Sequence, residues 1–313
     1  MRYDSFSLHA RDDCRLQGHR WLPKGEPEAL LQITHGMAEH AGRYAYLAES
    51  LCRAGYGVFA LDLRGHGRSA GAGLPGHFAE RDGWGKLLDD QLALNHLIRR
   101  HYPLAPIILL GHSIGCHIVL AYLLRYSCSV SAAILSGASY QPRWRYRMVW
   151  LIAQLECWRQ GPQGRSALLD WLSFGRFNQS FRPARTAFDW LSRDPAAVDA
   201  YIADPYCGFR CTNQLWLDLL AGLQETVPPR VLARIDAELP LLLLGGTRDP
   251  VSPGQRQHVL CRILREAGLN RVELKLYPEA RHELFNESNR DEVIGDLLDW
   301  LARLPARPLY CPL

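Results

Sequence analysis

Residues 111–115 read GHSIG, a G-x-S-x-G pattern of the kind that surrounds nucleophilic serines. An apolar run precedes these residues and a helical pattern follows them, so Ser113 is expected on a sharp turn between a strand and a helix. The glycines permit the turn, and the helix N-terminus favours the negative charge that develops in acyl transfer. Because the pattern is short, a serine in an ordinary strand–helix loop is the alternative. We interpret Ser113 as the nucleophile.

A serine hydroxyl needs a base, and the base needs an acid that fixes its tautomer. Asp249 and His282 follow Ser113 in that chain order, each shortly after a predicted strand. Sites of open α/β sheets form at the carboxyl ends of the strands, where these loops lie. The alternatives are a turn or capping role for Asp249 and a surface position for His282. We predict a triad of Ser113, His282 and Asp249.

Acyl transfer also needs backbone donors for the oxyanion. The N–H of Ile114, directly after the nucleophile, is one candidate. The second is the N–H of Met37, in the loop after the apolar run 29–33, where Gly36 lets the backbone approach the substrate. The alternative is that His35 and Gly36 only end the strand. We predict an oxyanion hole formed by Met37 and Ile114.

Three strings and two loops carry a family resemblance: HGMAEHAGRY at 35–44, DLRGHGRS at 62–69, the GHSIG turn, and the loops of Asp249 and His282. Together they span about residues 30–290. They resemble α/β-hydrolases of the group that contains monoacylglycerol lipases and bacterial lysophospholipase-like esterases. The first string is the most specific for this group. One departure is Cys116, where the family usually has a second glycine.

The resemblance implies a serine carboxylic-ester hydrolase that cleaves acyl monoesters through an acyl-enzyme, without a cofactor. No metal is expected, because His35 and His40 are not spaced as HExxH. Glu39 and Arg43 follow the oxyanion loop and are predicted to hold the hydroxyls of a glycerol-like leaving group. The alternative is that they cap the helix after Gly42. Asp62, which could suggest a nucleophilic aspartate, is interpreted as structural because the turn holds Ser113.

Strands and helices alternate on both sides of a long middle segment. This alternation predicts an α/β protein with a mostly parallel central sheet, helices on both faces and an inserted helical lid, the α/β-hydrolase fold. A hairpin is expected within the first 22 residues. The other expected strands are 29–33, 56–61, 106–110, 131–135, 239–244 and 272–277, and the expected helices are 43–54, 82–102, 114–126, 253–267 and 291–304.

The alternation stops between about residues 140 and 235, a segment that holds six of the nine tryptophans. A connection between a strand and the next helix is usually much shorter. We therefore expect two core segments, 1–139 and 236–304, a lid or cap at 140–235 and a loosely ordered tail at 305–313. The tryptophans are predicted to line an acyl tunnel, and the alternative is that they form the core of the lid.

The charge and the composition of the chain indicate which partners to expect. The net charge is +4, and only three of the 36 basic residues are lysines. Because the arginines are dispersed, no nucleic-acid partner is expected. Residues 107–124 carry no charged side chain but contain serine and histidines, so we interpret them as a strand and a helix rather than a membrane span. No signal peptide is visible and the nine cysteines are an odd number, so the chain is predicted to be cytoplasmic with reduced thiols. It is also predicted to be peripheral at the membrane, through transient contact of the lid with lipid.

Two alternatives to the esterase remain. The same three residues serve thioesterases, peptidases and acyltransferases, because a fold does not fix the substrate. A protein of this fold could also bind a hydrophobic ligand without turnover, although the presence of Ser113, Asp249 and His282 argues against that. The sequence predicts a small-molecule acyl ester as the ligand and leaves the oligomeric state open.

Overall fold

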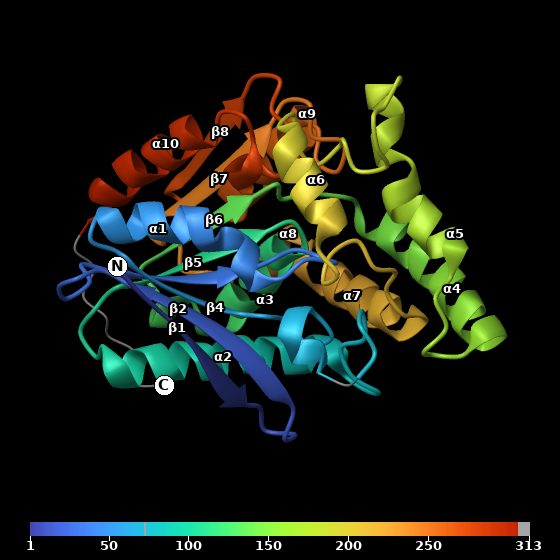
Figure 1. The fold of residues 1–313 in the computed structure, drawn as a ribbon, viewed down its shortest axis with the longest axis horizontal. Helices are drawn as coiled ribbons and strands as arrows, with labels where there is room; N and C mark the ends of the chain where they lie inside the picture. Colours follow the sequence, from blue (N-terminus) through green and yellow to red (C-terminus); the bar gives the residue numbers. More distant parts are fainter. Residues whose placement is uncertain (72, 306–313) are drawn as a thin grey trace.

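An eight-stranded sheet runs through the centre of the computed structural model, which describes residues 1–71 and 73–305 (Figure 1). The strand order is β1-β2-β4-β3-β5-β6-β7-β8. The pairs β1–β2 and β2–β4 are antiparallel, and the other five pairs are parallel. The strands are β1 (Arg2–His9), β2 (Arg15–Leu22), β3 (Leu30–Thr34), β4 (Gly57–Leu61), β5 (Ile107–His112), β6 (Ala132–Ser136), β7 (Leu241–Gly246) and β8 (Val272–Tyr277). The predicted hairpin and mostly parallel sheet are confirmed.

Helices cover both faces of this sheet (Figure 1). Buried side chains of α1 (Ala45–Arg53) and α10 (Arg290–Ala302) form one apolar core with one face. Those of α2 (Gly83–His101), α3 (Ile114–Tyr126) and α9 (Gly254–Glu266) form a second core with the other face. The strands β3 to β7 are buried along their whole length, as expected for parallel strands covered on both sides.

The strands β5 and β7 continue two residues beyond their expected ends. Pairing continues through His112 in β5, which is opposite Ser136, and through Gly246 in β7, which is opposite Tyr277. The sequence expectation stopped at the last large apolar residue, but small residues can remain in the ladder. As a result, the turn that carries Ser113 begins directly at the end of a buried strand.

The segment between β6 and β7 contains helices and, within the described residues, no strand. Its α-helices are α4 (Arg143–Gln160), α5 (Ala167–Asp170), α6 (Pro195–Ala203), α7 (Asn213–Thr226) and α8 (Pro229–Leu232). Helix α7 packs against α2 and α3, and α4 packs on α7 at the outer side of the molecule (Figure 1). We call residues 140–235 the insertion; its action as a lid remains a prediction.

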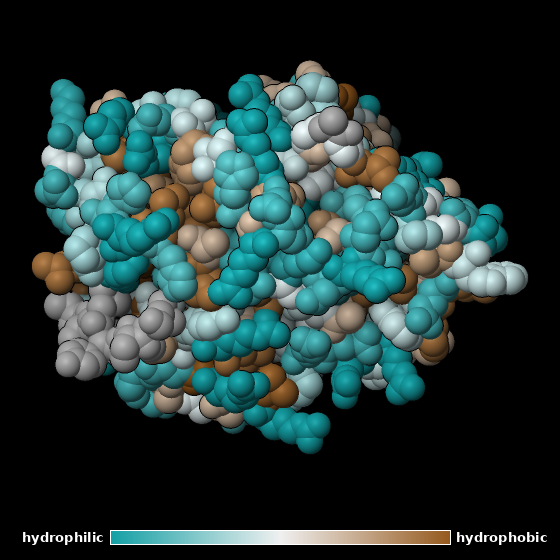
Figure 2. All heavy atoms as spheres, turned by 90° about the horizontal axis from the view of Figure 1, so that it is seen from below, coloured by the Kyte–Doolittle hydropathy of each residue, from teal (hydrophilic) through white to brown (hydrophobic). Residues whose placement is uncertain are grey.

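The stretch 107–124 is divided between β5 and α3, as interpreted from the sequence. None of the helices in the described ranges combines the length and apolar character that a membrane span requires. On the face shown in Figure 2, polar side chains predominate and apolar ones form small scattered groups. Seven described cysteines are free, but the expectation of reduced thiols is wrong for Cys128, which is disulfide-bonded. The predicted loose tail lies, from residue 306 on, outside the described residues.

Candidate active site

Ser113 occupies a strained turn between β5 and α3. Its φ and ψ are 53° and −117°, a conformation rarely adopted by residues other than glycine. A Cβ atom at Gly111 would lie 2.5 Å from the carbonyl oxygen of Gly115, and one at Gly115 would lie 2.1 Å from that of Thr34. Both glycines of the pattern are therefore required by close backbone packing. The N–H of Ser113 donates to Ser136 O, which ties the turn to β6.

Asp249 and His282 meet across the loops that follow β7 and β8. His282 Nδ1 lies 2.9 Å from Asp249 Oδ2, and both side chains are almost completely buried. The other oxygen of Asp249 accepts the N–H of Val251 at 2.9 Å. A Cβ atom at Gly246 would lie 2.1 Å from Ala280 O, so the two loops touch only because that residue is glycine. Both carboxylate oxygens of Asp249 are thus occupied by donors.

The surroundings of His282 raise its pKa. Burial alone would lower it, but the Asp249 carboxylate, its hydrogen bond and the nearby Glu283 and Glu39 outweigh that effect. The ring of His112 lies 4.8 Å from that of His282, and burial together with the neighbouring imidazole lowers the pKa of His112. His112 is therefore the neutral partner of the two, and His282 is the better proton acceptor.

Ser113 and His282 line the same cavity, whose volume is about 550 Å³. This volume is typical of small-molecule sites. The lining is mainly apolar, and most of its apolar side chains come from the insertion. These include Tyr146, Val149, Phe174, Phe177, Trp190, Trp216, Leu219, Leu220 and Leu223. Of the six tryptophans of the insertion, Trp144, Trp190 and Trp216 are on the cavity wall, whereas Trp158 is 84 % exposed. Three of the tryptophans therefore line a cavity, and whether that cavity holds an acyl chain stays a prediction.

The loop after β3 carries Met37 to the cavity. A Cβ atom at Gly36 would lie 3.3 Å from the Cβ of Ser113, so the loop passes close beside the turn. His35 Nε2 accepts the N–H of Leu63, which leaves the proton on Nδ1, and that proton is donated to Gly36 O. Among the described residues the N–H of Met37 has no acceptor. Ile114 begins α3, so its N–H also lacks an acceptor within the helix.

Glu39 and Arg43, the predicted substrate-binding pair, occupy different positions. Glu39 lines the cavity and its Oε1 accepts the N–H of Gly36 and the hydroxyl of Tyr44. Arg43 is not among the described residues of the cavity wall. Its guanidinium instead lies 2.9 Å from Glu39 and forms a bidentate pair with Glu283 at 2.5 and 2.6 Å.

This buried charge cluster has an electrostatic consequence. Burial raises the pKa of the Glu39 carboxyl, but Arg43, together with His112, His35 and the hydrogen bond from Gly36, lowers it to about 2. Glu39 is therefore ionised. Glu283, which also lines the cavity, was not predicted from the sequence. Its only signal was its position next to His282, because its partner Arg43 lies 240 residues earlier.

The insertion holds the loop of Met37 through its backbone. Ala38, with a positive φ of 55°, has a carbonyl oxygen that accepts both the hydroxyl of Tyr201, at 2.9 Å, and the N–H of Gly208, at 3.0 Å. Arg43 stacks over the Tyr201 ring, 4.8 Å from its centroid. Tyr201 also lines the cavity and was missed by the sequence analysis, since nothing in its local pattern indicates a contact with residue 38.

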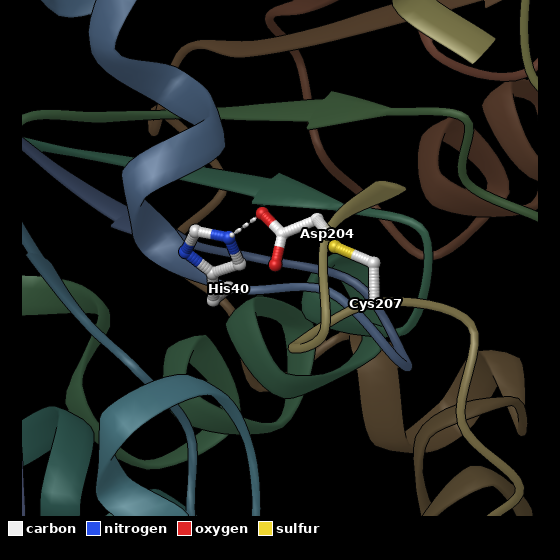
Figure 3. A group of neighbouring side chains, drawn as sticks. All are labelled: His40, Asp204 and Cys207. Atoms are coloured by element: carbon white, nitrogen blue, oxygen red, sulfur yellow. Dashed lines mark hydrogen bonds and ion pairs between the residues drawn. The ribbon is translucent and has the colours of Figure 1, made fainter. Parts of the chain in front are cut away.

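A second contact between the loop and the insertion contains three side chains that could ligate a metal: His40, Asp204 and Cys207 (Figure 3). Their ligand atoms lie within 4.8 Å of one another. The N–H of Gly42 donates to His40 Nδ1, so the imidazole proton is on Nε2 and is donated to Asp204 Oδ2 at 2.9 Å. The hydrogen bond between His40 Nε2 and Asp204 Oδ2 explains this pair as a structural link between the loop and the insertion. It also occupies Nε2, the nitrogen of His40 that would bind a metal.

The chain matches a known protein family along most of its length. The sequence model of the family described as serine aminopeptidase, S33, matches residues 25–289. The chain belongs to this family. A monoacylglycerol lipase of Mycolicibacterium smegmatis is 32 % identical over 284 residues, which cover 90 % of each chain. The monoglyceride lipase of Rattus norvegicus is 28 % identical over 90 % of this chain and 85 % of that protein.

The fold of the S33 hydrolase is also found in a solved structure. A thermostable carboxyl esterase from Bacillus coagulans, in complex with glycerol, matches it with a TM-score of 0.89 at 23 % identity, over 97 % of this chain and 99 % of the esterase. The expected α/β-hydrolase fold and the resemblance to monoacylglycerol lipases are confirmed. The S33 hydrolase is a serine hydrolase that acts on ester bonds.

Proposed function

We propose that the S33 hydrolase cleaves acyl monoesters, of the monoacylglycerol or lysophospholipid type, through an acyl-enzyme on Ser113. One observation carries the proposal: His282 is held by Asp249 through Nδ1 at 2.9 Å and shares a cavity with Ser113. An imidazole that donates from Nδ1 to a carboxylate has Nε2 available to accept a proton. The buried carboxylate then stabilises the imidazolium that forms.

The reaction follows from these roles. Ser113 Oγ attacks the ester carbonyl carbon while His282 Nε2 takes the hydroxyl proton, and the N–H groups of Met37 and Ile114 donate to the oxyanion. Collapse breaks the bond to the leaving alcohol, which receives its proton from His282. Water then attacks the acyl carbon while His282 takes one of its protons. The bond between the acyl group and Ser113 Oγ breaks, the acid leaves, and His282 returns the proton to Ser113 Oγ.

The side chains that line the cavity support an acyl chain on one side and a small polar alcohol on the other. Apolar side chains of α4 and α7 would hold the chain, and Glu39 and Glu283 would accept hydrogen bonds from hydroxyls of the leaving group. Arg43 does not contact the substrate in this proposal. Its guanidinium positions the carboxylates of Glu39 and Glu283, with which it is already paired. The names of the curated relatives support a glycerol monoester as the first substrate to test.

The outer side of α4 supports the lid and lipid-contact parts of the proposal. Leu151, Leu155 and Trp158 of α4 are 46 %, 59 % and 84 % exposed. Trp144 and Met148, which also line the cavity, continue the same helical spacing and are 62 % and 54 % exposed. An exposed apolar stripe of this kind, flanked by arginines, is typical of a helix that lies in a membrane interface. We propose that the insertion, residues 140–235, is a lid that contacts lipid transiently, and that the enzyme is cytoplasmic and peripheral at the membrane.

An aminopeptidase is the second candidate, suggested by the description of the family. One structural feature favours it: a single guanidinium, that of Arg43, faces both Glu39 and Glu283, so this wall carries one surplus negative charge. Such a charge suits the ammonium group of a peptide N-terminus as well as the hydroxyls of glycerol. Hydrolysis of aminoacyl p-nitroanilides, measured beside the esters, separates the two candidates.

The test is kcat/KM for glycerol monoesters with acyl chains from C2 to C16, measured below their aggregation limits. Each buried CH₂ contributes about 0.8 kcal/mol, so kcat/KM should rise about threefold to fourfold per carbon until the cavity is full. Trp216→Ala, on the cavity wall, should flatten this rise. Trp158→Ala, outside the cavity, is the matched control and should retain it. A flat profile in the wild type, or faster cleavage of the anilides, contradicts the monoesterase proposal.

A further inference from the structure

His117 is a buried polar residue in the wall of the cavity. Its side chain is on α3, four residues after Ser113, and only 5 % of the residue is exposed. Its Nδ1 is buried without a hydrogen-bond partner, and within the described part of the chain Nε2 has none either. A buried polar group without a partner is costly, so an imidazole in this state needs an explanation.

Other histidines show that this state is unusual in the molecule. Three more have one buried ring nitrogen without a hydrogen bond, although in His19 and His77 that nitrogen lies 3.5 and 3.4 Å from a carboxylate oxygen, and each forms a hydrogen bond through its other nitrogen. Those bonds join His19 to the Tyr3 hydroxyl, His66 to Arg64 O and His77 to the Thr212 hydroxyl. His117 differs from them in having no bond and in lining the cavity that holds Ser113.

The surroundings of His117 define what it could bind. Burial lowers its pKa to about 4, so the imidazole is neutral near pH 7 and offers one donor and one acceptor. Leu219, Leu220 and Leu223 of α7, which packs on α3, line the same cavity and provide only apolar surface. Nδ1 is fully buried, so the nitrogen that a ligand in the cavity could reach is Nε2. A ligand with a hydroxyl or a keto oxygen could pair with Nε2, whereas an alkyl chain could not.

The position of His117 locates that oxygen along the ligand. Four residues of α-helix correspond to a rise of roughly 6 Å, and Ser113, Ile114 and His117 all line the cavity. An acyl chain that starts at Ser113 and follows the first turn of α3 therefore passes the imidazole a few carbons after its carbonyl. The head-group side of the cavity, near Glu39, belongs to the other end of the substrate.

We propose that His117 is a specificity residue that selects acyl chains with a hydroxyl or keto oxygen a few carbons from the ester carbonyl. This inference rests on the proposed function and refines it, because it names the acyl group that the esterase prefers. A plain alkyl chain leaves Nε2 of His117 unpaired in the complex, and an oxygenated chain supplies a hydrogen bond to that nitrogen.

The experiment compares glycerol monoesters of decanoic acid and of its 3-hydroxy, 5-hydroxy and 10-hydroxy derivatives. The measured quantity is the ratio of kcat/KM for each hydroxy ester to that for the decanoyl ester. In His117→Leu, the ratio for the 3- or 5-hydroxy ester should fall about tenfold below that of the wild type, the effect of one neutral hydrogen bond. His117→Gln should restore part of it, and the ratio for the 10-hydroxy ester should not change.

Two outcomes are decisive. If the 3- and 5-hydroxy ratios are the same in the wild type and in His117→Leu, the inference is wrong, since a purely structural histidine would change all four esters equally. Calorimetric binding of the same esters to Ser113→Ala, with and without His117→Leu, separates this failure from that of the proposed function. If no ester is hydrolysed, the proposed function fails. The inference is then supported if the 3- or 5-hydroxy ester binds more tightly than the decanoyl ester only when His117 is present, and it is wrong if His117→Leu leaves that difference unchanged.

Discussion

Asp249→Asn is the substitution whose effect the structure specifies most closely. Asp249 Oδ2 accepts the proton of His282 Nδ1 and Oδ1 accepts the N–H of Val251, each at 2.9 Å. An asparagine has one acceptor oxygen for these two donors. If the oxygen stays with Val251, the amide NH₂ faces Nδ1 and forces the proton to Nε2, where the imidazole can no longer act as a base. If the oxygen turns to His282, the N–H of Val251 loses its acceptor at about 1–3 kcal/mol.

Either arrangement also removes the negative charge that stabilises the imidazolium. We therefore expect kcat to fall about 10⁴-fold, equivalent to about 5.5 kcal/mol of transition-state stabilisation. The assay is the steady-state hydrolysis of a short-chain p-nitrophenyl ester, with the melting temperature measured on the same samples.

The matched control is Asp62→Asn, a second buried aspartate at the end of a strand. Its two oxygens accept the N–H groups of Ala41 and Arg68, so the same change should cost about 1–3 kcal/mol of folding stability and little rate. The reasoning is refuted if Asp249→Asn retains more than a tenth of the wild-type kcat, or if Asp62→Asn lowers kcat as much while remaining folded.

Three further predictions concern pH, charge and positioning. Because the pKa of His282 is raised and only the neutral imidazole accepts a proton, kcat/KM should increase with pH through an apparent pKa above the ordinary value of about 6.5; a transition below 6 would contradict this. Arg43→Ala leaves two buried carboxylates without their cation, so it should lower the free energy of unfolding, measured in urea, by about 3–5 kcal/mol. Arg53→Ala, which removes an exposed ion pair, should lower it by less than about 1 kcal/mol, and equal losses would disprove the role of the cluster. Tyr201→Phe removes one of the two donors to Ala38 O and should lower kcat about tenfold with a smaller change in KM, and an unchanged kcat would show that the loop does not need it.

The core of the fold was predictable because its strands are short apolar runs that alternate with amphipathic helices. The positions of Ser113, Asp249 and His282 followed from the same alternation of strands and helices, since each residue comes shortly after a predicted strand. Loops at the carboxyl ends of parallel strands meet at one edge of the sheet, so chain order alone was enough to expect these three residues together.

The contacts of the insertion were not predictable in this way. Tyr201 reaches Ala38 across 163 residues, and Arg43 reaches Glu283 across 240. Such pairs leave no periodic signal in the sequence, because they depend on how the helices of the insertion pack on the core. The unpaired state of His117 also depends on that packing, since α7 packs on α3.

The role of Ser113 is the central claim, and trapping the acyl-enzyme tests it most directly. The protein is mixed with a fluorophosphonate, and intact mass, the labelled residue and the remaining esterase activity are followed in parallel. We predict one adduct per chain on Ser113, loss of activity in proportion to labelling, and no rapid labelling of Ser113→Ala or His282→Ala. Full labelling with retained activity, an adduct on another residue, or a Ser113→Ala protein with more than a tenth of the wild-type turnover would contradict the account.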